Sequence, residues 1–242
     1  MNSRKEEIDH YWKLRDAFYG SEGIQLYNRI LSSQLSYYTF EMNYIELHQF
    51  IELHYKLRSE RKLGDFYNRK PLHDYLAELT RLLHNFLASA KSLVDHTRNF
   101  IRNSYGNRGE LVAEYDKEVK LRLSNNPVCK FTQELRVFFT HISMPFVSSV
   151  IGASNATGRD LYTLKLNIDK MGKSERWSAK AREYIQNSGP DIDLETYVDE
   201  YYQVIHQFYE WLGDRNEIWG KEALEKALRI QDEILKYGKH EP

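Results

Sequence analysis

The chain has 242 residues and a mass of 28.9 kDa, enough for one large domain or two small ones. Its 34 basic and 35 acidic side chains give a net charge of -1, which excludes a strongly basic nucleic-acid coat and a strongly acidic disordered tail. The single cysteine, Cys129, excludes an intrachain disulfide and a four-thiolate zinc site. This composition is typical of a globular protein, and we expect a cytoplasmic location.

Two features of the sequence disfavour insertion into a membrane. The N-terminal segment is charged and lacks the apolar region of a secretory signal. The longest stretch without charge, residues 137–158, carries too many polar side chains for a membrane helix. We therefore expect no membrane association.

The predicted elements are mostly long helices, because only five prolines and twelve glycines interrupt the chain. Helices are expected over 6–18 and 40–58, followed by a charged loop to residue 71. The strongest helical pattern begins at Pro71 and continues to about residue 103. Its apolar positions recur at alternating steps of four and three, the seam of a bundle or coiled coil. These positions are Leu72, Leu76, Leu79, Leu83, Phe86, Ala90, Leu93, Thr97 and Phe100.

The second half of the chain adds shorter helices and a change of period. After a break rich in glycine and asparagine, a short helix is expected to about residue 123, and Pro127 begins another that ends near 143, before Pro145. Residues 161–168 alternate between apolar and polar side chains, which predicts one arm of a β-hairpin with one buried face. Three helices are expected at 177–186, 193–212 and 216–237.

These elements predict a mostly α fold, a helical bundle with long antiparallel helices and one inserted β-hairpin at about 146–168. We expect a single helical domain over 1–242. A separate N-terminal helical extension over 1–70, with a core over 71–242, is an alternative that the sequence does not demand.

The familiar catalytic and nucleotide-binding motifs are absent from the sequence. There is no nucleotide P-loop, no Gly-x-Gly-x-x-Gly, no His-Glu-x-x-His and no Gly-x-Ser-x-Gly. A ferritin-like metal site needs two Glu-x-x-His motifs, and only Glu7 and His10 fit one. We therefore expect no metal and no cofactor. Cys129 is interpreted as a small residue in the first turn of a helix rather than as a nucleophile.

The most informative motif is Arg136-Val-Phe-Phe-Thr-His141, an Arg-x4-His pair in the helix that ends before Pro145. Chance alone accounts for that spacing, since the composition predicts about two such pairs when four to six intervening residues are allowed. The helical context is more specific. A long helix carrying the segment LHNFLASAKSLVDHTR (83–98) precedes it.

Together these two helices resemble the HEPN superfamily of helical bundles, over roughly Pro71 to Pro145. That family includes metal-independent endoribonucleases of toxin–antitoxin, phage-defence and CRISPR systems. The resemblance implies that an Arg-x4-6-His motif supplies the active residues and that two motifs meet across a homodimer. Carried over to this sequence, the catalytic residues are Arg136 and His141, and a cognate antitoxin or defence partner is implied.

The chemistry of these two residue types suits RNA cleavage without a metal. A histidine with a pKa near neutrality can move the proton of the ribose 2′-OH, and a guanidinium can hold the scissile phosphate. Arg136 and His141 are five residues apart, about 140° around an ideal helix. The length of the arginine, or pairing across a dimer, would be needed to bring both groups to one phosphate.

One departure from the family pattern keeps other functions open. Family nucleases usually carry a polar residue, often asparagine, directly after the arginine, and this chain has Val137. A non-catalytic HEPN-like module that binds a protein or nucleotide partner is therefore the alternative. A third possibility is an unrelated helical scaffold in which Arg136 and His141 pair with local carboxylates.

The long helix also carries a polar row that could contact RNA. His84, Lys91 and Arg98 are spaced seven apart, and Asp95 lies between the last two in angle. We take these four as candidate substrate-binding residues, with an ordinary solvated helix face as the alternative. The tyrosine pairs at 37–38 and 201–202 could stack on bases, although core packing explains most such rings better.

Overall fold

The computed structural model describes residues 2–64, 67–142, 147–153, 160–169 and 177–237. It confirms a mostly α bundle that carries a small antiparallel sheet. The elements in chain order are α1 (Asn2–Gly20), α2 (Glu22–Ser59), α3 (Lys70–Tyr105), α4 (Gly109–Glu118), the π-helix η1 (Val119–Ser124), α5 (Pro127–His141), β1 (Val147–Ala153), β2 (Asp160–Asn167), α6 (Ala179–Ser188), β3 (Asp191–Asp193) and α7 (Leu194–Tyr237).

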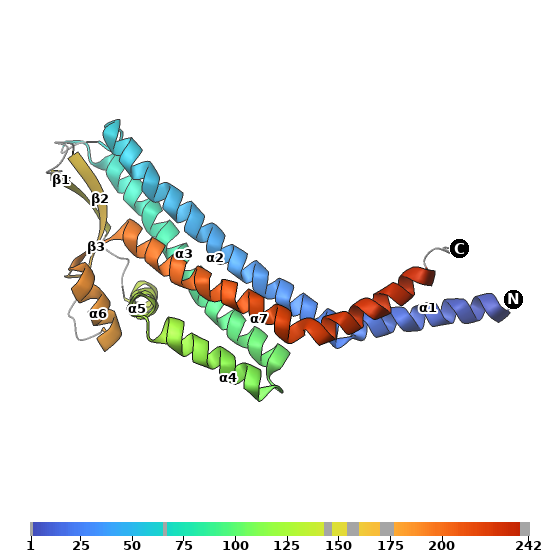
Figure 1. The fold of residues 1–242 in the computed structure, drawn as a ribbon. Helices are drawn as coiled ribbons and strands as arrows, with labels where there is room; N and C mark the ends of the chain where they lie inside the picture. Colours follow the sequence, from blue (N-terminus) through green and yellow to red (C-terminus); the bar gives the residue numbers. More distant parts are fainter. Residues whose placement is uncertain (1, 65–66, 143–146, 154–159, 170–176, 238–242) are drawn as a thin grey trace.

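Three long helices form the body of the molecule. In Figure 1, α2 runs antiparallel to both α3 and α7 and lies along them, while α4, α5 and α6 lie on the other side of α7. The seam predicted for α3 is confirmed, since its positions from Leu79 to Phe100 are buried. Phe40 of α2 stacks on Phe86 of α3 with ring centroids 5.3 Å apart, which joins two of these helices at the core.

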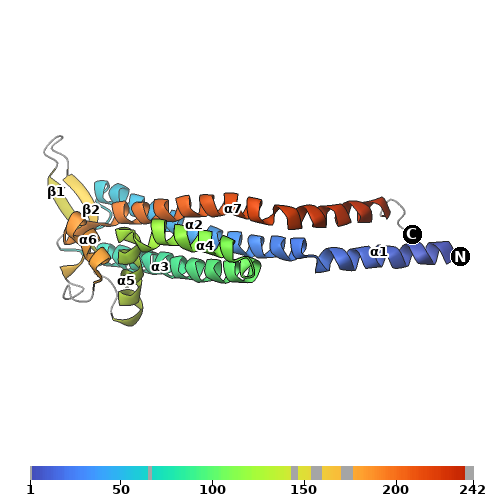
Figure 2. The same ribbon diagram turned by 60° about the horizontal axis from the view of Figure 1, so that its bottom comes forward.

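The N-terminal helices are longer than the sequence predicted. The hydroxyl of Ser21 accepts a hydrogen bond from the backbone N–H of Ile24 at 3.3 Å, so α2 begins there rather than near residue 40. Gly23 lets the first turn of α2 approach α7 closely, because a Cβ at this position would lie 2.2 Å from the carbonyl oxygen of Ala223. Beyond this contact, α1 and the end of α7 extend from the body as a two-helix arm (Figure 2).

The prediction of two separate helices at 193–212 and 216–237 is wrong, because α7 is continuous from Leu194 to Tyr237. The glycine at 213 stays within the helix. Its cost of about 1 kcal/mol relative to alanine is outweighed by the buried face that continues through Leu212, Asn216 and Trp219.

A three-stranded antiparallel sheet in the order β1-β2-β3 caps one end of the bundle. Val147 pairs with Leu166, and Leu166 also pairs with Ile192 of β3, a strand that the sequence pattern did not reveal. Leu164, Leu166 and Ile168 are buried, which confirms the single buried face predicted for the second arm. The middle of the predicted hairpin, residues 154–159, and the stop at Pro145 lie outside the described residues.

Across the described ranges, none of the helices combines the length and the apolar character needed to cross a lipid bilayer.

Candidate functional site

A cavity of about 200 Å³ lies between α3, η1, α5 and α7. Four of its described lining residues carry a positive charge, and the described lining contains no Asp or Glu. The cations are Lys91 and Arg98 from α3 and Lys130 and Arg136 from α5. We call this the cationic cavity. A cavity with this lining favours an anionic ligand, because each cation near the opening lowers the free energy of a bound negative charge.

The cavity brings together three of the residues that the sequence singled out. Lys91 and Arg98 share a row of α3, two turns apart, and Arg136 reaches the same space from α5. The crossing of α5 over α3 is fixed by apolar contacts, since Phe131 and Leu135 are completely buried in the core. The Asn126 side chain caps α5 by accepting a hydrogen bond from the Val128 N–H at 3.0 Å.

The π-helix forms one wall of the cavity. The backbone N–H of Asn125 donates to the carbonyl of Lys120 at 3.2 Å, the spacing of five residues that defines this helix. Val119, Leu123 and Ser124 of this segment line the cavity. π-helical turns are rare and are frequent at functional sites, because the wider turn displaces side chains from α-helical positions. The sequence predicted an ordinary short helix here.

Within the described ranges, Arg136 and Arg98 have no carboxylate partner. The Nε atom of the half-buried Arg136 is shielded from solvent and has no hydrogen-bond partner among the described residues. Arg98 is exposed and forms no ion pair with any residue that the structure describes. Burial raises the pKa of Tyr115, in the cavity wall, to about 12, and the positive charge of Arg98 acts in the opposite direction. The charge of Arg98 is therefore felt at the cavity wall. Both guanidiniums are available to an anion.

Lys91 is in a different position, because it forms an ion pair with Asp95 one turn further along α3. Both side chains remain partly exposed, so the pair contributes little to stability. Asp95 therefore offsets the charge of one cation at the rim and is not itself part of the lining. An anion that binds at Arg98 would compete with Asp95 for Lys91.

Hydroxyl-bearing residues also line the cavity, and the sequence pattern did not connect Tyr201 or Thr132 with Arg136. Tyr201 is only 5% exposed and lines the cavity, and no hydrogen bond of its hydroxyl is found within the described part of the chain. Thr132, also in the lining, accepts a hydrogen bond from the Tyr197 hydroxyl at 3.1 Å. Tyr201 belongs to the apolar stripe of α7, so its spacing indicated core packing and gave no signal of a polar role. Of the two pairs considered for base stacking, Tyr201 is buried and Tyr38 is exposed.

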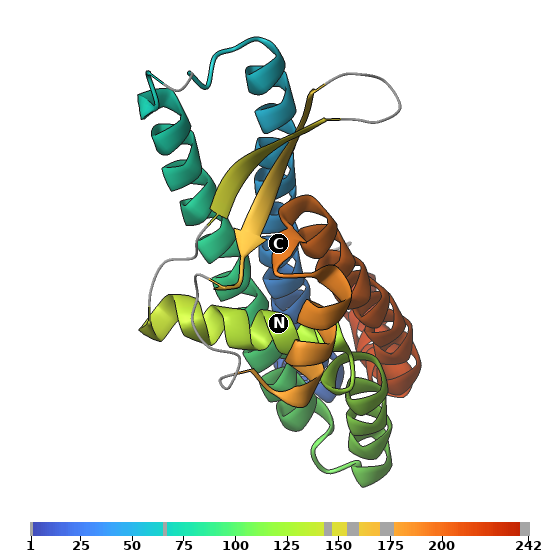
Figure 3. The same ribbon diagram turned by 90° about the vertical axis from the view of Figure 1, so that its left-hand side faces the viewer.

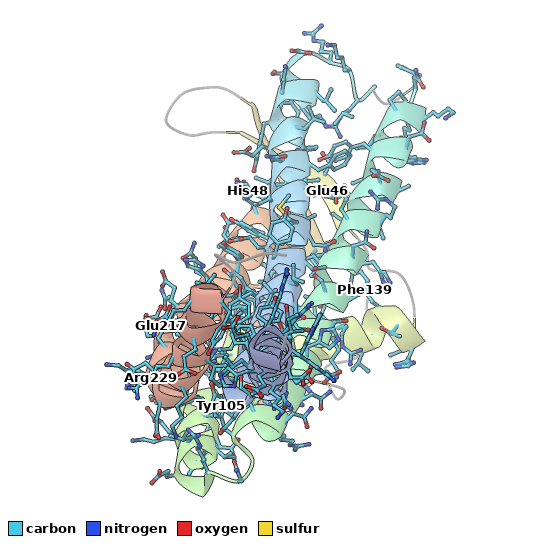
Figure 4. All side chains as sticks on the ribbon, turned by 90° about the vertical axis from the view of Figure 1, so that its right-hand side faces the viewer. Glu46, His48, Tyr105, Phe139, Glu217 and Arg229 are labelled. Atoms are coloured by element: carbon cyan, nitrogen blue, oxygen red, sulfur yellow. The ribbon has the colours of Figure 1, made fainter. Side chains whose placement is uncertain are left out.

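His141 and His84 do not line the cationic cavity. His141 is the last residue of α5 and is exposed. The end of α5 projects to the side of the long helices, as Figure 3 shows, and Figure 4 labels Phe139 on this part of the helix. His84 lies two turns before Lys91 on α3 and is half-buried. Within one chain, Arg136 and His141 therefore face different directions, as their separation on the helix implies.

The remaining candidates offer little nucleophilic or metal chemistry. Cys129 lines the cavity, and burial raises the pKa of its thiol to about 12, so the thiol is protonated at neutral pH. Among the residues with described positions, no group of three or more His, Cys, Asp or Glu side chains is arranged to hold a metal ion. The chemistry that this arrangement supports is recognition of a phosphate or another oxyanion.

No family model, curated protein or solved structure matches the chain, so comparison with known proteins does not assign it to a family.

Proposed function

We propose that the chain is a HEPN-like, metal-independent endoribonuclease that acts on single-stranded RNA as a homodimer. The observation that carries the proposal is the cationic cavity, in which Arg98 and Arg136, neither in an ion pair with a residue that the structure describes, lie beside Lys91 and Lys130. Guanidinium groups bind phosphate oxygens in a bidentate manner and hold them more firmly than a point charge does. Arg136 is the phosphate-binding residue of this proposal.

The size of the cavity favours part of a polymer over a complete small molecule. Its volume of about 200 Å³ is below the range of about 300–1,000 Å³ that is typical of small-molecule pockets. One backbone phosphate with part of its ribose could enter while the rest of the strand stays on the surface. A single strand suits this geometry because its backbone is free to bend into the opening.

Cleavage would use the ribose 2′-OH of the RNA as the nucleophile. Its oxygen attacks the adjacent phosphorus as its proton passes to an imidazole, the P–O5′ bond breaks, and the 5′ oxygen takes up a proton. The products are a 2′,3′-cyclic phosphate and a 5′-hydroxyl. Arg136 stabilises the extra negative charge on the phosphorane oxygens. Because His141 lies outside the cavity of its own chain, the imidazole in this mechanism is His141 of the partner subunit.

The first test is cleavage of mixed cellular RNA in the presence of EDTA by the wild type, Arg136→Ala and His141→Ala. We expect cleavage by the wild type alone, with 2′,3′-cyclic phosphate ends. A 1:1 mixture of the two inactive variants tests the shared site. If one site contains Arg136 of one chain and His141 of the other, half of the exchanged dimers hold one intact site, so about a quarter of wild-type activity returns. Full activity in His141→Ala would contradict the assignment of this residue.

A non-catalytic module that binds RNA or a nucleotide partner is the second candidate. It is favoured by the position of His141 outside the cavity and by Val137, which is 40% exposed where the family usually has a polar side chain. The two candidates differ in one measurement. A wild-type protein that binds RNA through Arg98 and Arg136 but leaves it uncut, with and without EDTA, would support the binding module and exclude the nuclease.

A further inference from the structure

The outer face of α2 differs from an ordinary solvated helix face. Between Gly23 and Phe40 the sequence contains a single charged residue, Arg29. Its Nη1 atom donates to the backbone carbonyl of Asn103 on α3 at 2.6 Å, so this charge is engaged within the bundle. By contrast, the exposed positions of α3 and α7 include Arg81, Arg98, Glu210 and Glu217 among others. Depletion of charge on an exposed face is typical of protein–protein interfaces.

A row of large apolar side chains follows the middle of this face. Leu31, Leu35, Tyr38 and Met42 are 42%, 59%, 56% and 41% exposed. We call these four residues the α2 seam. Their steps of four, three and four are those of a coiled-coil seam, and they lie opposite Phe40, which is completely buried. Single apolar residues scattered over a surface would not follow the period of the helix. A regular row of large apolar side chains therefore indicates a surface that packs against another helix.

The α2 seam is self-complementary. Its steps read four, three, four in both directions, so an antiparallel copy of the same helix presents the same pattern. In this register Leu31 lies opposite Met42 of the partner subunit, and Leu35 lies opposite Tyr38 of the partner subunit. A two-fold axis then passes between residues 36 and 37, which gives the isologous contact typical of homodimers. One charged residue, Glu41, flanks the seam, and its carboxylate accepts hydrogen bonds from the hydroxyls of Tyr37 and Tyr202. In this register Glu41 lies opposite Ser32 of the partner subunit, so no like charges face each other.

The accessible area of the seam approaches what a specific dimer interface buries. Together with Tyr27, which is 53% exposed, the seam leaves on the order of 500 Å² accessible on each chain, taking roughly 200 Å² for a large side chain. Two copies would therefore bury about 1,000 Å² before any polar neighbour is counted, which reaches the lower limit for a specific interface.

We propose that a second copy of this chain covers the α2 seam in an antiparallel, two-fold contact. Helix α2 lies on the edge of the bundle away from α4, α5 and α6 (Figure 1), and none of the four seam residues lines the cationic cavity, so this contact leaves the cavity open. The inference does not rest on the proposed function. A shared Arg136–His141 site needs a contact near α5, so the α2 seam would be a second interface between copies.

The test is the mass of the full chain in solution, measured by light scattering and by sedimentation equilibrium over a range of concentrations. Leu35→Glu places a charge at the centre of the seam, and we expect it to weaken seam-dependent association by about tenfold or more. Leu228→Glu is the matched control, because Leu228 is 56% exposed on α7 away from the seam. We expect this variant to associate like the wild type. Circular dichroism and the thermal midpoint verify that both variants are folded.

Crosslinking tests the register. In a Cys129→Ser background, chains with Leu35→Cys are mixed with chains carrying Tyr38→Cys, and disulfides are allowed to form under mild oxidation. The antiparallel seam favours the mixed disulfide, whereas a parallel contact favours disulfides between two identical variants.

The proposal is overturned if the wild type stays monomeric at the highest concentration, if Leu35→Glu associates as strongly as the wild type, or if disulfides between identical variants dominate. RNA binding by Leu35→Glu, measured separately, should remain at the wild-type level and reports only on the cavity.

Discussion

The Nε2 atom of His54, near the end of α2, lies 2.9 Å from the Oγ atom of Ser149 in β1. Arg58, one turn further along α2, donates from Nε and Nη2 to the same oxygen at 3.2 and 2.9 Å. These contacts attach the sheet to the bundle. His54 is completely buried, and burial together with the positive charge of Arg58 lowers its pKa to about 4. The ring is therefore neutral at pH 7 and can accept the Ser149 hydroxyl proton in a hydrogen bond.

We predict that the stability of the fold decreases as the pH falls from about 6.5 to about 4. In this window the unfolded chain binds a proton at residue 54, whose ordinary pKa is 6.5, and the folded chain does not. The neutral His54 ring contributes on the order of 3 kcal/mol to the free energy of unfolding. This contribution is fully present above pH 6.5 and is lost by about pH 4. Urea unfolding at pH 7 and at pH 4.5 measures the difference.

His54→Gln removes this titration and keeps a polar group near Ser149, so its free energy of unfolding should change less between the two pH values. His96→Gln is the control, because His96 is an exposed histidine. Among the described residues, its ring forms a hydrogen bond only with the Ser36 hydroxyl, at 2.9 Å. Equal pH dependence in the wild type and His54→Gln would show that another group accounts for acid sensitivity.

Two glycine substitutions should have opposite effects on stability. Gly23→Ala forces a Cβ to within 2.2 Å of the Ala223 carbonyl and 2.7 Å of the Ala227 Cβ, and should destabilise the fold by about 1–3 kcal/mol. Gly213→Ala meets no atom within 4 Å in the middle of α7 and should stabilise it by about 0.5–1 kcal/mol. Thermal and urea unfolding measure both. A neutral Gly23→Ala would mean that the start of α2 does not pack closely on α7.

Substitution of either cavity arginine should weaken RNA binding and reduce its dependence on salt. Arg98→Ala and Arg136→Ala each remove a charged hydrogen-bond donor worth about 1.5–3 kcal/mol, which corresponds to roughly 10- to 150-fold in affinity. Each should also reduce the slope of log affinity against log salt by about 0.7. Fluorescence anisotropy with a labelled single-stranded RNA gives both values.

Arg102→Ala is the control for this series, since Arg102 is an exposed arginine of the same helix that does not line the cationic cavity. It should change the affinity only slightly. Equal losses for Arg98→Ala and Arg102→Ala would indicate a diffuse surface interaction rather than binding at the cavity.

The Cys129 thiol should react slowly with a thiol-specific disulfide reagent at pH 8. Its pKa of about 12 leaves very little thiolate in the folded protein, whereas the unfolded chain has an ordinary thiol. The ratio of rates in native buffer and in urea measures this protection. Rapid modification of the native protein would show that the cavity wall around Cys129 opens. An anion bound in the cavity should slow the reaction further.

The local periodicities were sufficient to predict the fold class. The four–three repeat of α3 and the two-residue alternation of β2 are signals carried by a few adjacent turns or residues, so neither depends on distant contacts. The missed strand β3 is only three residues long and exists because β2 supplies its hydrogen-bond partners. The length of α7 likewise depends on what its face packs against, since Gly213 taken alone suggests a break.

For the candidate site, the sequence supplied residue types and a spacing on single helices. It placed Lys91 and Arg98 in one row, because both lie on α3. It showed that Arg136 and His141 point in different directions, but it could not show that Arg136 of α5 joins Lys91 and Arg98 or that Tyr201 of α7 lines the same space. Those relations depend on the crossing of α5 over α3 and on the wider turn of η1, which are set by the packing of buried side chains from four separate segments. The tertiary structure alone therefore decided which of the predicted residues share a site.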